Sequence, residues 1–230
     1  MNGKIIAMFA LAGLGAAAPV TAATTVLDFS GNICGVTGNL ACNDGTQIGQ
    51  NYGDSAALNV AYRSILTSTN TTAEAFLKFW GSNYGDLVNV VWGGSDSVNY
   101  RSEITFTPAP GFEVALITLD AGCYFNRASC RQLNYDIRVI GGAALAIGSM
   151  PTFFPFHGTL AVNSAYYASG IALSWGPDSY DTGLDNITFD VRAIAAPGIP
   201  EPASWALLIG GFTMVGGAMR TRRQLAHTAR

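Results

Sequence analysis

The sequence predicts an all-β body, an antiparallel β-sandwich or jelly roll, between an N-terminal signal peptide and a short C-terminal transmembrane helix. Short apolar segments rich in Val, Ile, Tyr, Phe and Trp recur between clusters of Gly, Asn, Asp and Pro, which is typical of strands and turns. Hydrophobic residues make up 49% of the 230 residues, enough for a sizeable core. Charged residues make up only 12%, which indicates membrane-directed segments at the ends.

Residues 1–23 have the pattern of a secretory signal peptide. Lys4 supplies a positive charge, an apolar run follows from Ile5 to Ala18, and small residues come next. We expect export by the Sec machinery and cleavage by signal peptidase after Ala22 or Ala23. The alternative is an uncleaved membrane anchor, although the apolar run is shorter than the ~20 residues that a spanning helix needs.

Residues 24–194 form the predicted sandwich. The strand-length segments are Val26 to Phe29, Leu58 to Leu66, Leu87 to Trp92, Glu103 to Thr107, Phe112 to Leu119, Leu133 to Ile140, Gly158 to Val162, Ile171 to Trp175 and Ile187 to Ala193. In the last segment apolar and polar residues alternate, which predicts one buried and one wet face. Thr71 and Glu74 have capping-box spacing, so a short helix competes with a strand from Thr71 to Trp80, and we expect the helix.

The charge of the body excludes nucleic acid as an expected partner. Residues 24–199 hold 7 basic and 14 acidic side chains, a formal charge of −7. Such a surface repels phosphate backbones, and no basic patch is visible in the sequence.

The four cysteines form two local pairs, Cys34 with Cys42 and Cys123 with Cys130. In an exported chain we expect disulfides. Three connectivities are possible, and bridging of nearest neighbours is favoured because short loops close at the least entropic cost. A metal site is the rival interpretation.

Three aspartates, Asp178, Asp181 and Asp185, crowd the loop before the last strand. Closely spaced oxygen ligands could hold calcium, which is the one cofactor that the sequence suggests. Turn formation is the competing interpretation, because Asp side chains bond to nearby backbone groups.

The sequence contains no convincing catalytic constellation. His227 lies beyond the predicted membrane segment, so a secreted Ser-His-Asp site would have to use His157, which follows an apolar run and has a core or edge position as its simpler interpretation. Neither G-x-S-x-G nor H-E-x-x-H occurs. We therefore predict that the protein is not an enzyme. Trp80, Trp92 and Trp175 could stack on sugar rings, or could serve the core.

The C-terminal region begins with a linker at residues 195–199 and continues with a tail at residues 200–225. Pro200 and Pro202 flank Glu201 and favour an extended segment. The next 17 residues, 203–219, are uncharged and would measure about 25 Å as a helix, a minimal span. Trp205 marks one membrane interface, and a cluster of arginines marks the cytoplasmic one: Arg220, Arg222 and Arg223.

This order of features resembles the PEPxxWA type of the PEP-CTERM sorting domain. The matching residues are Pro200, Glu201, Pro202, Trp205 and Ala206, followed by a glycine-interrupted apolar helix and the arginine cluster. The resemblance implies recognition by exosortase in the inner membrane and removal of the tail near the Pro-Glu-Pro motif. It also implies delivery to the cell surface or outside a Gram-negative bacterium that makes exopolysaccharide. An ordinary tail anchor is the alternative.

Segments of the body such as GDLVNVVWGG and GLDNITFDV are similar to those in β-rich bodies of the same family. Related folds serve as carbohydrate-binding modules, so we expect a structural or carbohydrate-binding component of a polysaccharide matrix. Two other hypotheses stay open: a secreted hydrolase of that matrix, and a permanently anchored periplasmic protein.

Overall fold

The computed structural model describes residues 23–95, 99–125, 127–130, 132–152, 154–195, 205–213 and 215. The chain divides into two compact units, residues 1–193 and residues 194–230. Nearly all of the predicted signal peptide lies outside the described residues. So do the Pro200, Glu201 and Pro202 motif, most of the linker, and Arg220, Arg222 and Arg223.

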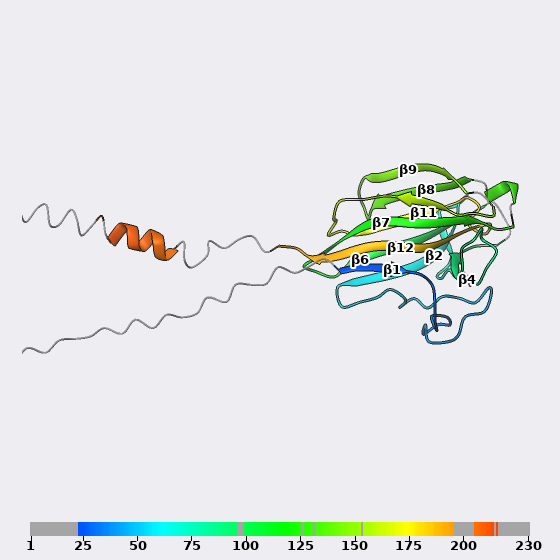
Figure 1. Cartoon of the computed structure of the whole chain (residues 1–230), viewed down its shortest axis with the longest axis horizontal. Helices are drawn as coiled ribbons and strands as arrows, with labels where there is room; N and C mark the ends of the chain where they lie inside the picture. The colour runs from blue at the N-terminus through cyan, green and yellow to red at the C-terminus, as the bar shows by residue number, and fades with distance from the viewer. Residues whose placement is uncertain are drawn as a thin grey trace, which may run out of the picture. The chain divides into compact units, whose positions relative to one another are not determined.

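The body consists of two antiparallel sheets of six strands each (Figure 1). Sheet I contains, in spatial order, β10 (Gly158–Ala161), β7 (Phe112–Cys123), β12 (Thr182–Ala193), β5 (Val90–Trp92) and β4 (Lys78–Trp80), with β1 (Ala23–Leu27) also paired to β12. Sheet II contains β3 (Thr71–Glu74), β2 (Leu58–Leu66), β6 (Tyr100–Pro108), β11 (Ile171–Trp175), β8 (Gln132–Val139) and β9 (Ala144–Pro151). A 3-10 turn, η1, spans Ala128–Cys130.

The two sheets pack face to face over one apolar core. Phe106 of sheet II and Phe189 of sheet I meet at its centre with their ring centroids 5.1 Å apart. Both residues are fully buried, and around each of them the strand alternates between buried apolar and more exposed polar residues, over Ile104 to Thr107 and over Ile187 to Asp190. The predicted antiparallel β-sandwich is therefore confirmed.

The expected helix from Thr71 to Trp80 is wrong. Thr71–Glu74 forms a hairpin with β2 instead, through a turn in which Asn70 adopts a φ of 56°. Lys78–Trp80 then pairs with β5 in the other sheet, which buries Leu77 and Phe79 between the sheets. The two strand pairings and the burial of apolar side chains stabilise this arrangement more than a capping box would stabilise a helix. A capping box is a weak local signal, because a short helix also depends on tertiary packing for its stability.

Strand β12 fixes the two ends of the sandwich. At its start Thr182 pairs with Cys123, and at its end Ala193 pairs with Phe112. We call the first end the tip and the second the base. The strand has 12 residues, so the tip and the base are about 40 Å apart. The chain enters the body at the base, because Ala23 of β1 pairs with Val191.

In the second unit, residues 205–213 and 215 are helical. Trp205 and most of its neighbours in this helix are exposed, and Ala206 lies in its first turn. Within the described residues, no helix combines the length and hydropathy that crossing a bilayer requires.

Candidate functional site

The candidate site is a group of aromatic side chains at the tip, which we call the aromatic tip. Its members come from three parts of the chain, residues 80–92, residues 124–127 and Tyr180: Trp80, Tyr84, Trp92, Tyr124, Phe125, Arg127 and Tyr180. The rings form a chain of edge and tilted contacts with centroids 4.6 to 6.1 Å apart. Five of these residues, Trp80, Tyr84, Trp92, Tyr124 and Tyr180, belong with Leu87 and Val90 to a second apolar cluster, separate from the core between the sheets.

Two glycines on sheet I make room for the first of these segments. Gly122 of β7 and Gly183 of β12 lie directly opposite each other. A Cβ atom on Gly183 would lie 2.8 Å from the ring of Tyr84, and one on Gly122 would collide with the Tyr84 carbonyl oxygen. The sheet therefore carries no side chains at these two positions, and the segment around Tyr84 lies directly on its backbone.

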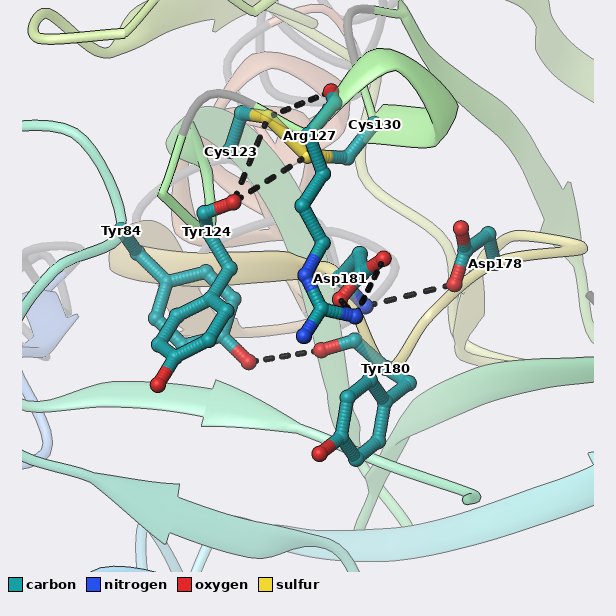
Figure 2. A network of polar contacts seen from close by, with 8 residues as sticks. All are labelled: Tyr84, Cys123, Tyr124, Arg127, Cys130, Asp178, Tyr180 and Asp181. Carbon is teal, nitrogen blue, oxygen red and sulfur yellow. Dashed lines mark hydrogen bonds and ion pairs between the residues drawn. A yellow bond between two sulfur atoms is a disulfide. The ribbon is translucent and has the colours of Figure 1, made fainter. Parts of the chain in front are cut away.

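Arg127 holds the aromatic tip together (Figure 2). Its guanidinium Nη1 lies 3.0 Å from Asp181 Oδ1, and the Asp181 side chain is almost fully buried. The same guanidinium group lies over the ring of Tyr124 at 5.5 Å and that of Tyr180 at 5.9 Å. Tyr84 is joined to the backbone of Tyr180, since its hydroxyl donates a hydrogen bond of 2.6 Å to the Tyr180 carbonyl oxygen. Cation–π contacts and a partly buried ion pair therefore fix the two tyrosine rings.

The structure contains both disulfides that the spacing of the cysteines favours, Cys34–Cys42 and Cys123–Cys130. The second bridge closes the segment that carries Tyr124, Phe125 and Arg127. In the same segment the Arg127 carbonyl oxygen lies 3.3 Å from Cys123 Sγ (Figure 2). The bridge thus joins the end of β7 to η1 and restrains the backbone from which three site residues project.

Two exposed phenylalanines lie at the aromatic tip. Phe125, one of its members, is 55% exposed and packs edge-on against Tyr124. Phe156 is 66% exposed, and its carbonyl oxygen lies close to Gly85, next to Tyr84 in the chain. Large apolar side chains that remain in water at one end of a sandwich mark a surface for a ligand or partner.

The three tryptophans have different positions. Trp175 is 1% exposed in the main core, where its Nε1 donates a hydrogen bond to the Thr182 carbonyl oxygen. Trp92 is buried in the second cluster. Only Trp80 is partly exposed, at the aromatic tip. Of the three, Trp80 is thus the one with a surface that could contact a sugar.

Two tyrosines of the aromatic tip, Tyr84 and Tyr124, stay neutral at physiological pH. Burial raises the pKa of Tyr84 well above its usual range, and the nearby Asp181 carboxylate adds to the rise. Desolvation also raises the pKa of Tyr124. Neutral phenols can donate a hydrogen bond as well as accept one, which suits hydroxyl-rich ligands.

The three aspartates of the calcium prediction do not converge on one point. Asp178 accepts a hydrogen bond from the Asp181 backbone N–H, and Asp181 is paired with Arg127. Asp185 lies on β12 and accepts a bond from the N–H of Asn186. Within the described ranges, no group of three or more His, Cys, Asp and Glu side chains is arranged to hold a metal ion.

His157 lies beside aspartates on the outer face of sheet I. Its Nδ1 is 2.7 Å from Asp86 Oδ1, and its Nε2 is 3.9 Å from Asp120 Oδ1. This hydrogen bond lowers the pKa of Asp86. In the part of the chain that the structure describes, hydrogen bonds and ion pairs join His157 to aspartates and to no serine, so a Ser-His-Asp arrangement is not assembled there.

Sequence reasoning did not identify Tyr84, Phe125, Arg127 or Tyr180 as site residues. A signal was present, because the short segment between Cys123 and Cys130 contains two aromatic residues and Arg127. Tyr84 and Tyr180 reach the site only through the topology, which brings their loops to the same end of the sandwich.

Comparison with known proteins gives little further information. No family model matches the chain, and no curated protein sequence matches it. Among solved structures, the chain is similar to an isomalto-dextranase of Arthrobacter globiformis T6 in complex with panose, with 8% identity and a TM-score of 0.28. The match covers 75% of this chain and 33% of that protein, so the chain spans about a third of the length of that enzyme.

Proposed function

We propose that this chain is an exported protein whose β-sandwich binds carbohydrate through the aromatic tip. One observation carries the proposal: exposed and partly exposed aromatic rings gather on a tip that a disulfide and an Arg127–Asp181 ion pair hold in place. The apolar faces of pyranose rings stack on aromatic faces, and a fixed platform loses little conformational entropy on binding.

The proposal includes the handling of the chain ends. Signal peptidase removes the first 22 or 23 residues after Sec export, and exosortase recognises Pro200, Glu201 and Pro202 in the tail. The motif, Trp205 and the arginines of the sequence support this route. The product is a matrix component on or outside the cell, which is also where disulfides persist.

Retention on the exopolysaccharide of the producing bacterium tests the binding function. The exported protein, purified from the producing bacterium, should be retained without shortening the polysaccharide. Phe125→Ala and Phe156→Ala should each weaken binding about tenfold, because each removes about 1.4 kcal/mol of stacking. Val36→Ala is the matched control, because Val36 is 79% exposed on a different loop.

Two results would contradict the proposal. One is unchanged retention of a variant that carries both substitutions. The other is release of new reducing ends that His157→Ala abolishes, which would favour the hydrolase.

A further inference from the structure

A groove on the outer face of sheet II leads toward the aromatic tip. It consists of two adjoining hollows of about 390 Å³ and 190 Å³. Both are lined by Asn134, Gly176 and Pro177, so they are continuous. The larger hollow extends to Ile147 on the edge strand β9, and the smaller one extends to Asp178.

The strand register builds the floor of the groove. Ile147, Asp136 and Ser174 lie side by side on β9, β8 and β11. Gly176 lies in the floor with a φ of 144°, and a Cβ atom there would lie 2.8 Å from Arg101 Cα. A side chain at this position would therefore clash with the neighbouring strand, and its absence keeps the floor low.

The charges of the groove are balanced. Asp136 is paired with Arg138 at 2.7 Å, and Arg101 donates a hydrogen bond of 2.6 Å to Asn70 Oδ1. Beside Ser174 on the neighbouring strand β6, buried Glu103 is paired with Arg63 and accepts a bond of 3.0 Å from the Ser174 hydroxyl. Since the surrounding body has a formal charge of −7, it repels polyanions. Fixed planar polar groups beside apolar surface suit a neutral ligand with many hydroxyl groups.

The smaller hollow ends where the aromatic tip begins. Asp178 lines this hollow and accepts a hydrogen bond from Asp181, the partner of Arg127 (Figure 2). Tyr180 lies between them in the chain and packs edge-on against Trp92 at 4.9 Å. A ligand that leaves the groove at Asp178 would thus meet the aromatic rings.

We infer that the groove and the aromatic tip together bind an internal stretch of a neutral, linear polysaccharide, not a chain end. Pro177 and Asn134 contact the part of the polysaccharide that lies on sheet II, and the aromatic tip contacts the next sugar units. This inference rests on the proposed function, because it extends the carbohydrate site of the tip.

Calorimetric titration against neutral oligosaccharides tests the inference. The probes are size-fractionated fragments of the neutral exopolysaccharide, from disaccharide to octasaccharide, with oligogalacturonates of the same lengths as the charged series. Affinity for the neutral series should rise about tenfold from the shortest to the longest fragment. Oligogalacturonates should bind more weakly at each length.

Asn134→Trp should fill the junction of the two hollows. We expect it to weaken binding of the octasaccharide about tenfold and to leave disaccharide binding within about twofold. Ile147→Ala, on the far edge of the groove, should give a smaller loss of the same kind, and it tests the groove even if the larger side chain disturbs folding. Thr72→Trp is the matched control, because Thr72 is exposed on the opposite edge strand of the same sheet.

The outcomes separate this inference from the proposed function. Affinity that is independent of length, preference for oligogalacturonate, or unchanged octasaccharide binding by both groove variants overturns the groove assignment and leaves the aromatic tip in place. If the wild-type protein binds no fragment at all, the carbohydrate function itself is wrong.

Discussion

Asp185 is a buried carboxyl group that should make stability depend on pH. Burial raises its pKa from 3.8 to about 7; the bond from Asn186 N–H opposes the rise, and the Asp120 carboxylate adds to it. Asp28 and His157 also face this group. The folded state therefore holds a proton that the unfolded state lacks between about pH 4 and pH 7. The contribution of the Asp185 carboxyl group to the free energy of unfolding is complete below pH 4 and is lost as pH rises through 7.

We predict that Asp185→Asn raises the free energy of unfolding at pH 8 by on the order of 2 to 4 kcal/mol. The variant should also lose the decline in stability that the wild type shows between pH 4 and 7. Urea unfolding at a series of pH values measures both effects. Asp190→Asn on the same strand is the control. Parallel pH profiles for wild type and Asp185→Asn would contradict the prediction.

Single residues were hard to place from the sequence, because burial depends on contacts that the sequence does not list. Trp80, Trp92 and Trp175 each end a short apolar segment, so the local sequence does not distinguish them. Of the three, only Trp80 keeps a partly exposed surface. Phe156 is the last residue of the apolar run before His157, yet it is 66% exposed. Its position is set by its contact with the segment around Gly85, which is some 70 residues away in the chain.

The Cys123–Cys130 bridge is the element that we expect to matter most for binding. Replacing both cysteines by alanine should cost about 2 to 3 kcal/mol of stability, because the unfolded loop is released. It should also weaken polysaccharide retention about tenfold, since Tyr124, Phe125 and Arg127 lose a fixed backbone.

The Cys34–Cys42 bridge supplies the control for this experiment. It spans a similar separation, 8 residues against 7, but lies outside the aromatic tip. Its removal should cost about as much stability and leave retention unchanged. Equal binding by the two double variants, measured under conditions in which both are folded, would show that the Cys123–Cys130 bridge does not organise the site.

Strands with strong apolar patterns were predictable, and strands without them were not. Leu58–Leu66 and Ile171–Trp175 have the predicted bounds, because β-branched and aromatic residues there match a half-buried face. Ala144–Pro151 was missed, since Ile147 is its only β-branched residue. The segment from Thr71 was assigned wrongly because a local capping signal does not reveal that the two halves of the segment pair with β2 and β5.

For the whole molecule, the sorting tail makes the sharpest prediction. Two prolines already restrict the chain around Glu201, so an extended strand can enter a protease cleft at little entropic cost. Glu201→Ala should therefore block removal of the tail in the producing bacterium without changing the melting temperature of the body. Intact mass and cell fractionation measure the outcome, with Ser204→Ala at a spacer position as the control.

A mature wild-type protein that keeps Arg230 at the cell surface would contradict exosortase processing. So would normal processing of both Glu201→Ala and a variant without the prolines. In either case the chain would be a permanently anchored protein, and the aromatic tip would act while still fixed to the membrane.

The course of β12 from tip to base determines how the body would carry mechanical tension. A pull between a polysaccharide held at the tip and the chain leaving Ala193 acts along the axis of this strand. The hydrogen bonds to β7 and β1 lie across that axis, so tension shears many of them at once instead of opening them one after another. Resistance to forced unfolding is a matter of the unfolding rate, and a strand loaded in this direction has to slide past both neighbours before it can leave the sheet.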